Sequence, residues 1–324
     1  MKIQNITIAI IAIIIACIYA LKPTDKAELP IIAIANYGSH SSLIASIRGF
    51  KDGMKKEGYI DGQNIKFEVA DVNFDASLIP QMISKLKSYN PKVMVVMTTP
   101  IAQFAKGSVK DIPLIYSVIT DPVEAGLIKD ANTPESMITG SSEKQDIKLV
   151  LEFATKLIPS AKRVGILYST SESNDIALVK MVKSAALSLN IEVVAIPVDQ
   201  ARDVSIAMQN FNGKVDFIYV GTSGPIQPTL PVIASLADKM KIPVINSDEG
   251  AVQDGLVLAS FGVNYEKVGA NAARLAAGFL NGKAIKDLAP IYPNIADHQG
   301  FINKRKANEL GIDIPSIENL TIVE

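Results

Sequence analysis

The sequence has one cysteine, no tryptophan and two histidines among its 324 residues. Because the single cysteine, Cys17, lies in an apolar segment near the amino terminus, no disulfide joins parts of this chain, and its core must be sufficient alone. An excess of one charge is also missing, since 32 Lys and Arg residues oppose 33 Asp and Glu residues. Without a basic excess, a nucleic-acid partner is not expected.

Motifs of the common catalytic and cofactor-binding sites are missing as well. The sequence has no Gly-x-Ser-x-Gly elbow, no Walker A loop and no Gly-x-Gly-x-x-Gly after a strand. His40 and His298 are far apart in the sequence, and no residues have the spacing of metal ligands. We therefore expect no catalytic residue, no metal and no cofactor, and we interpret His298 as a surface residue.

The one long apolar run, "ITIAIIAIIIACIYAL", lies at the amino terminus after Lys2. It is short for a membrane span of about 20 residues but suits the core of a signal peptide. Ile14-Ile15-Ala16-Cys17 resembles the lipobox of bacterial lipoproteins, in which the cysteine is acylated. The alternative is an ordinary signal, or an uncleaved anchor, in which Cys17 is incidental. In each case we expect residues 1–28 to be leader and linker, and the rest to be exported, either periplasmic or anchored on the outer face of the cytoplasmic membrane.

After the leader, strand-like and helix-like patterns alternate. Continuous apolar strands separated by helical segments are typical of a parallel sheet that is covered on both faces. The pattern then restarts at "KRVGILYSTSESND". Within it, "DFIYVGTSGP" around Thr222 repeats the strand, hydroxyl-rich turn and proline of "VMVVMTTP" around Thr98. The sequence therefore predicts an α/β fold with two doubly wound parallel-sheet lobes.

The turns that follow the predicted strands are rich in Ser, Thr, Asn and acidic residues. Turns at the carboxyl ends of parallel strands lie on the edge of the sheet where ligands bind. Hydroxyl groups and the free N–H groups of a helix start attract an anion such as a carboxylate. Helix capping is the alternative explanation, because Ser, Thr and Asp are also the favoured N-cap residues.

Five segments together resemble a known family: "GFKDGMKKEGYIDGQNI", "TTPIAQ", "IPLIYSVITDPVEAGLI", "KLIPSAKRVGILYSTSESND" and "GVNYEKVGANAARLAAGFLNGK". They are similar to segments of ABC-transporter substrate-binding proteins related to the tryptophan-import lipoprotein, which have the type I periplasmic binding protein fold. The resemblance implies two lobes joined by three hinge strands, with a small solute held in the cleft. It also implies a membrane permease and an ATPase as partners.

The resemblance further implies that the chain crosses between the lobes three times. We expect these crossings near residues 120–122, 248–251 and 282–288. The N-terminal lobe then comprises residues 29–120 plus 252–284, and the C-terminal lobe comprises residues 121–251 plus 285–324. Asp121 precedes a proline, which favours the extended backbone of a crossing strand.

An amino acid, aromatic ones included, is the solute that these residues favour, because it needs hydrogen-bond donors for its carboxylate and an acid for its ammonium. The candidate residues are Thr98, Thr99, Ser171 and Thr222 as donors, Asp121, Asp248 and Glu249 as acids, Tyr37 as an aromatic wall, and His40, Thr120 and Asn174 as further contacts. A ligand-sensing module for a signalling receptor would use the same cleft. An α/β enzyme that acts in the cleft is a less favoured alternative.

We predict that Cys17→Ala releases the protein from the membrane fraction of a bacterial host. The substitution removes the thiol that an acyl chain would occupy, and with it the anchor. Fractionation and the mass of the N-terminal peptide check this prediction. An unchanged membrane fraction without lipid mass would contradict acylation.

Overall fold

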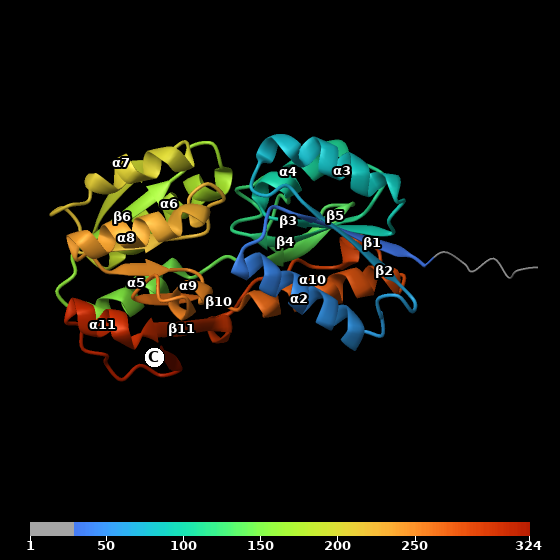
Figure 1. Cartoon of the computed structure of the whole chain (residues 1–324). Helices are drawn as coiled ribbons and strands as arrows, with labels where there is room; N and C mark the ends of the chain where they lie inside the picture. The colour runs from blue at the N-terminus through green and yellow to red at the C-terminus, as the bar shows by residue number, and fades with distance from the viewer. Residues whose placement is uncertain (1–28) are drawn as a thin grey trace, which may run out of the picture.

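The computed structural model describes residues 29–324, so the predicted leader and Cys17 lie outside the described residues. The described chain forms two α/β lobes side by side (Figure 1). Within this part of the chain, no helix has the length and apolar character needed to cross a membrane.

The first lobe is built on five parallel strands in the order β2-β1-β3-β4-β5. The strands are β1 (Ile31–Asn36), β2 (Lys66–Asp71), β3 (Val93–Met97), β4 (Leu114–Ile119) and β5 (Ile138–Ser142). One face of the sheet is covered by α3 (Ile79–Ser88) and α4 (Thr99–Ser108), and the other by α2 (Ser41–Lys56) and α10 (Tyr265–Leu280) (Figure 1). The last helix returns to this lobe from a distant part of the sequence.

The second lobe contains a seven-stranded sheet in the order β12-β11-β10-β9-β8-β6-β7. Its strands are β6 (Arg163–Tyr168), β7 (Glu192–Pro197), β8 (Phe217–Val220), β9 (Val244–Asn246), β10 (Ala259–Val263), β11 (His298–Asn303) and β12 (Leu320–Val323). Its helices are α5 (Ile147–Leu157), α6 (Ser173–Ser188), α7 (Val204–Gln209), α8 (Leu230–Met240), α9 (Gly250–Gln253) and α11 (Lys304–Leu310). Only the β10–β11 pair is antiparallel among the strands described.

The two sheets share one topology. The order β7-β6-β8-β9-β10 in the second lobe repeats the order β2-β1-β3-β4-β5 of the first. The prediction of two doubly wound, parallel-sheet lobes is therefore confirmed. Because the strands are parallel, each lobe gathers its strand-to-helix turns on one edge of its sheet.

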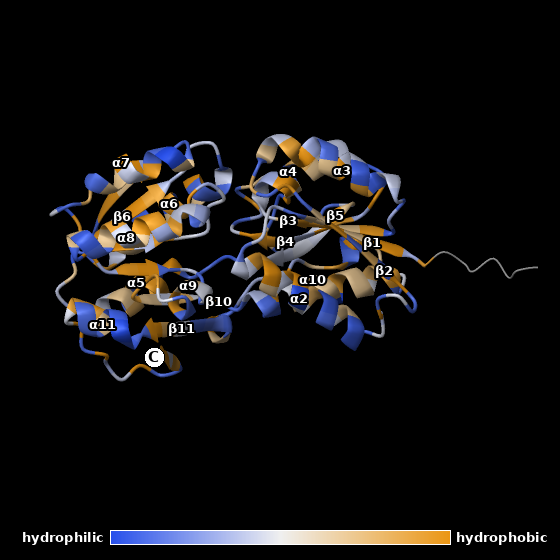
Figure 2. Ribbon diagram, viewed as in Figure 1, coloured by the Kyte–Doolittle hydropathy of each residue, from blue (hydrophilic) through white to orange (hydrophobic). Residues whose placement is uncertain are grey.

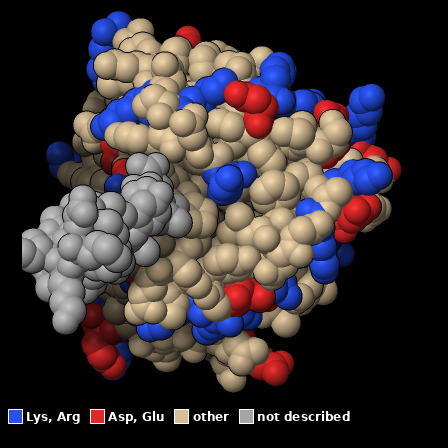
Figure 3. All heavy atoms as spheres, turned by 90° about the vertical axis from the view of Figure 1, so that its right-hand side faces the viewer, with Lys and Arg blue, Asp and Glu red and all other residues tan. Residues whose placement is uncertain are grey.

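Burial of apolar strands between helices forms the core of each lobe. Every residue of β3 and β8 is buried, and inner strands such as β1 and β6 are mainly orange, and so apolar, in Figure 2. The edge strands β2 and β7 are only partly buried. The face shown in Figure 3 carries charges of both signs interspersed, without a large basic area. This charge distribution agrees with the formal net charge of −1.

The three crossings lie later in the chain than expected. Strand β5 pairs with β4, so residues 121–142 belong to the first lobe and the chain leaves it at residues 143–145. Asp121 does not start a crossing strand, because its carboxylate accepts hydrogen bonds from the N–H groups of Val123 and Glu124 and turns the chain back.

The second and third crossings differ from expectation in the same direction. Strand β10 pairs with β9 and β11, so residues 252–263 belong to the second lobe and the chain crosses between Val263 and Asn264. Ile291 still bridges to Ser141 of the first sheet, so the last crossing spans residues 292–297. The expected boundaries at residues 252 and 285 are therefore corrected.

Small residues let α2 and α10 approach closely in the first lobe. A Cβ atom at Gly49 would collide with the backbone of Glu266, and one at Gly269 would collide with the carbonyl oxygen of Ser46. These contacts seat α10 on the first lobe immediately after the second crossing. The start of α10 is thereby held at a fixed place beside the interlobe cleft.

We predict that Gly269→Ala lowers the free energy of unfolding by about 1–3 kcal/mol, because the added methyl group overpacks the α2–α10 contact. Gly107→Ala is the matched control, since Gly107 is an exposed position of α4 with open space around it. That change should stabilise the protein by about 0.5–1 kcal/mol. Urea unfolding of both variants measures the difference, and a Gly269→Ala protein as stable as wild type would refute the packing argument.

Candidate functional site

A cavity of about 70 Å³ lies between the lobes, where the carboxyl edges of the two sheets meet. The first lobe contributes turns after β1, β2, β3 and β4, and the second lobe contributes turns after β6 and β8. The volume is below the roughly 300–1,000 Å³ of pockets that bury a small ligand. A solute that needs a pocket of about 300 Å³ or more can therefore enter only after the lobes have separated.

The lobes touch along this cleft. The hydroxyl groups of Thr120 and Thr222 are 3.3 Å apart, and the Tyr37 hydroxyl donates to Glu172 Oε1 at 3.2 Å. Ser42 Oγ donates to Asp248 Oδ1 at 3.0 Å, and Ser41 donates to the same carboxylate. These contacts join residues of opposite lobes, so the structure is a closed arrangement.

Seven of the candidate residues line the cavity: Tyr37, His40, Thr98, Thr99, Thr120, Asn174 and Thr222. Each lies in, or within two residues of, a turn that follows a strand. The alternation of strands and polar turns in the sequence therefore predicted that they lie on the same edge. His40 also caps α2, since its Nδ1 accepts from the Ser42 N–H at 3.4 Å. Burial lowers the pKa of His40, although the nearby Asp248 carboxylate opposes this effect.

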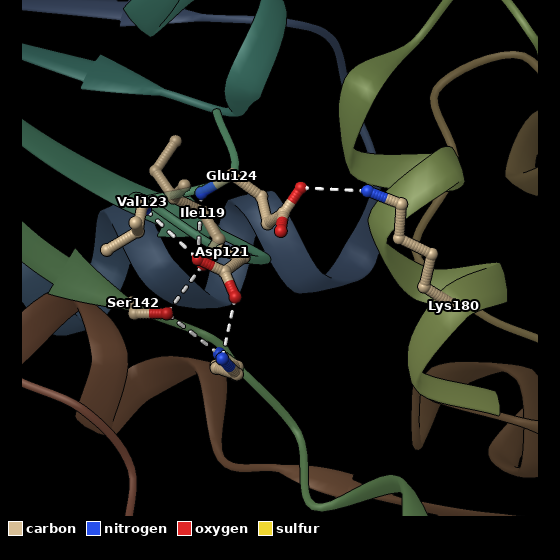
Figure 4. Close-up of polar contacts among 7 residues, drawn as sticks. Ile119, Asp121, Val123, Glu124, Ser142 and Lys180 are labelled. Carbon is tan, nitrogen blue, oxygen red and sulfur yellow. Dashed lines mark hydrogen bonds and ion pairs between the residues drawn. The ribbon is translucent and has the colours of Figure 1, made fainter. Parts of the chain in front are cut away.

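Four candidates lie outside the described lining of the cavity. Asp121 Oδ2 pairs with Lys144 Nζ at 2.6 Å. The other oxygen of Asp121 caps a turn by accepting from the Val123 N–H (Figure 4). Asp248 links the lobes through Ser41 and Ser42, as described above. Ser171 Oγ bonds the Ser169 hydroxyl at 2.8 Å. Glu249 lines a separate hollow beside Asp248.

Two buried glutamates line the cavity in place of the expected aspartates. Glu143 lies on the first crossing, and Glu172 lies at the start of α6. The sequence signal for Glu143 was the acid in "SSEKQD" directly after β5, but the low apolar content of "ITGSS" hid that strand. Tyr265 also lines the cavity; it lies in the "GVNY" segment, to which no ligand role was assigned.

Burial changes the acid–base behaviour of these groups. It raises the pKa of Glu143 to about 7, against the smaller opposing effect of hydroxyls on Tyr265, Thr120 and Thr222. Burial likewise raises the pKa of Glu172, whose carboxylate accepts from Tyr37, Asn174 and the Gly224 N–H. The described residues that line the cavity include no Lys or Arg. The cavity is therefore acidic and has no cation of its own.

Four polar atoms of the cavity lining are buried and find no hydrogen-bond partner within residues 29–324. They are Thr98 Oγ1, Glu143 Oε2, Asn174 Oδ1 and the Tyr265 hydroxyl oxygen. Buried polar groups are nearly always paired, and leaving one unpaired costs about 1–3 kcal/mol. Their convergence on one cavity is the pattern expected of groups that a ligand completes.

Backbone strain also gathers at this cavity. Thr98 has φ 73° and Val118 has φ 57°, although both are β-branched and neither is glycine. Val118 lies at a register shift between β4 and β5. Such backbone conformations cost on the order of 1–3 kcal/mol each and cluster at ligand sites. The strained Thr98 places its hydroxyl at the N-terminus of α4 without using it as a cap.

Comparison with known proteins gives the family. Residues 31–321 match the family described as ABC transporter substrate binding protein. A tyrosine-binding protein of Clostridioides difficile (strain R20291) is 34% identical over 303 residues, which cover 94% of this chain and 87% of that protein.

Two solved structures agree with this assignment. The ABC domain in complex with L-Trp from Streptococcus pneumonia has a TM-score of 0.85 at 28% identity, covering 91% of this chain and 100% of that one. A ligand-free, open substrate-binding protein from Clostridium difficile scores 0.71 at 31% identity, covering 91% and 99%. The lower score against the open form agrees with the interlobe contacts described here. The chain belongs to the ABC transporter substrate-binding proteins, a family of non-enzymatic solute-binding proteins of ABC importers with the type I periplasmic binding protein fold.

Proposed function

We propose that this protein binds an aromatic amino acid between its lobes and delivers it to an ABC importer. The observation that carries the proposal is the set of buried, unpaired polar atoms in one acidic cavity, among them those of Thr98, Glu143 and Asn174. The relatives named for tyrosine and for L-Trp support the aromatic class.

The ends of the cavity differ in chemistry in the way that a zwitterion requires. At α4, the first N–H groups of the helix have no partner within it, and the free Thr98 hydroxyl lies beside them. This end suits a carboxylate. Glu143 offers an unpaired carboxylate oxygen, and in a cavity without Lys or Arg the positive charge must come from the solute. This group suits the ammonium.

Aromatic residues supply the remaining wall. Tyr37 and Phe74 both line the cavity and pack edge-to-face with ring centroids 5.8 Å apart. Tyr265 lines the same cavity from the start of α10. Such surfaces favour an aromatic ring, because ring pairs gain about 0.5–1.5 kcal/mol beyond their area burial.

The family and the predicted leader indicate where in the cell the protein works. We propose that the protein is exported and works on the outer side of the cytoplasmic membrane, held by a lipid on Cys17. A permease and an ATPase are its proposed partners, since a substrate-binding protein alone moves nothing across a membrane. The motif that supports the lipid is Ile14-Ile15-Ala16-Cys17.

We predict that Thr98→Val weakens binding of L-tyrosine or L-tryptophan by about 0.5–1.5 kcal/mol, because it removes the hydroxyl that meets the carboxylate. Stability should not fall, since this hydroxyl makes no cap bond and has no partner among the described residues. Calorimetry and thermal melts of the same samples separate the two effects.

Asp121→Asn is the matched control for Thr98→Val. It removes the charge that pairs with Lys144 while staying away from the cavity, so it should cost about 0.5–1 kcal/mol of stability and leave affinity alone. A Thr98→Val protein that loses stability but keeps its affinity would make Thr98 a structural residue. Absence of binding by any aromatic amino acid would refute the proposed function.

We predict that binding releases a proton near neutral pH. The pKa of Glu143 is raised to about 7 in the closed structure, mainly by burial, and an ammonium beside it favours the charged form and lowers that pKa. Affinity should therefore rise with pH up to about 7, level off above it, and fall as the pH drops below it. Calorimetry in buffers of different ionisation enthalpy measures the proton release.

Glu143→Gln is the control for the proton release. The amide keeps the shape and cannot titrate, so binding should weaken by roughly tenfold or more and lose its pH dependence around 7. Asp175 is unchanged in this variant, and its pKa is also raised to about 7 by burial. If the proton release persists in Glu143→Gln, the group that loses the proton is Asp175 and not Glu143.

A further inference from the structure

The orientation of the Asn174 amide is determined by its neighbours. Its Nδ2 donates to Asp175 Oδ1 at 2.9 Å, to Glu172 Oε2 at 3.2 Å and to the Thr222 carbonyl oxygen at 3.3 Å. A backbone carbonyl only accepts hydrogen bonds, so the NH₂ group must face it. The amide oxygen therefore faces away from this cluster.

Asn174 Oδ1 is consequently a free acceptor in the wall of the cavity. The residue is 9% exposed, and its Oδ1 is buried without a hydrogen-bond partner among residues 29–324. The side chain cannot turn to relieve this, because a flip would set Oδ1 against the Thr222 carbonyl oxygen. A bound solute that places a hydrogen-bond donor here removes the free-energy cost of the unpaired oxygen. A solute without such a donor leaves the oxygen buried and unpaired.

The position of Asn174 indicates which part of the solute it meets. Glu172 joins Asn174 to the Tyr37 hydroxyl, and Tyr37 packs on Phe74, so Asn174 borders the aromatic part of the cavity. Glu143 has its own free oxygen for the ammonium, on the first crossing. The ammonium therefore does not need Asn174.

We propose that Asn174 determines specificity by accepting a hydrogen bond from a donor on the solute's aromatic ring, a phenol O–H or an indole N–H. This inference rests on the proposed function and narrows it to aromatic amino acids that carry such a donor. Phenylalanine is rejected because it buries Asn174 Oδ1 without a partner. A site built to hydrogen-bond a solute group discriminates strongly against the analogue that lacks it.

The first test changes the solute and leaves the protein intact. Calorimetry compares L-tyrosine with L-phenylalanine, and L-tryptophan with its benzothienyl analogue, in which sulfur replaces the ring N–H. We expect each donor-bearing solute to bind at least about tenfold more tightly than its partner. Equal affinities within both pairs would overturn the role of Asn174 while leaving the proposed function in place. No binding by any of the four would overturn both.

The second test changes the protein. In Asn174→Leu, the tyrosine-to-phenylalanine affinity ratio should fall toward one, with tyrosine losing affinity and phenylalanine keeping it. A uniform loss for both amino acids would mean that Asn174 contacts the shared ammonium or carboxylate, and would overturn the inference. A thermal melt without solute shows whether the variant is folded, and if it is not, the comparison of solutes on wild-type protein decides.

Ser171→Ala is the matched control. Ser171 lies in the turn that leads into α6, three residues before Asn174, but its hydroxyl is bonded to Ser169 at 2.8 Å and it does not line the cavity. The affinity ratio should be unchanged in this variant. A change as large as that in Asn174→Leu would show that the turn as a whole, and not the Asn174 acceptor, determines specificity.

Discussion

The burial of the Glu143 carboxylate at the first crossing is the constraint on which the closed structure depends. This side chain is 3% exposed and accepts a hydrogen bond from Thr120 of the first lobe at 3.1 Å. Hydroxyl groups of Thr222 and Tyr265, from the second lobe and from the start of α10, also lie close enough to lower its pKa. A carboxyl group at this position lies next to hydroxyl groups of both lobes and also lines the cavity.

The crossings tie this group to the two sheets. Two residues after Glu143, Gln145 accepts a hydrogen bond from Tyr219 of β8 at 3.1 Å, so the crossing is fastened to the second sheet. Tyr265 opens α10, whose glycine contacts with α2 seat it on the first lobe. Movement of one lobe against the other must therefore change the surroundings of Glu143. A solute that pairs with Glu143 favours one arrangement, which is how binding shifts a two-state equilibrium.

The architecture and part of the site were predictable from the sequence, because apolar periodicity and parallel topology act together. Thr98 and Thr222 each follow a buried strand. Because the strands are parallel, both residues lie at the sheet edges that form the cleft. The crossings were not predictable in this way. Strand β5 reads as a loop, since "ITGSS" is small and polar, yet all five of its residues are buried and Gly140 lies against Tyr116 of β4. Because β5 was not predicted, the first crossing was expected near residue 121, and Glu143 on the actual crossing was not among the expected site residues.

Two of the expected acids, Asp121 and Asp248, lie outside the cavity lining because their carboxylates bond to other groups of the protein. The short Asp121 side chain reaches the N–H groups two and three residues ahead, so it caps its own turn, and Asp248 is taken by hydroxyls of the other lobe. Glu172 stands at the N-cap of α6, yet its side chain makes no cap bond and reaches the cavity instead. Asp121 is therefore committed to the backbone beside it, as short acidic side chains often are, whereas the longer Glu172 side chain extends past its own helix start to the cavity.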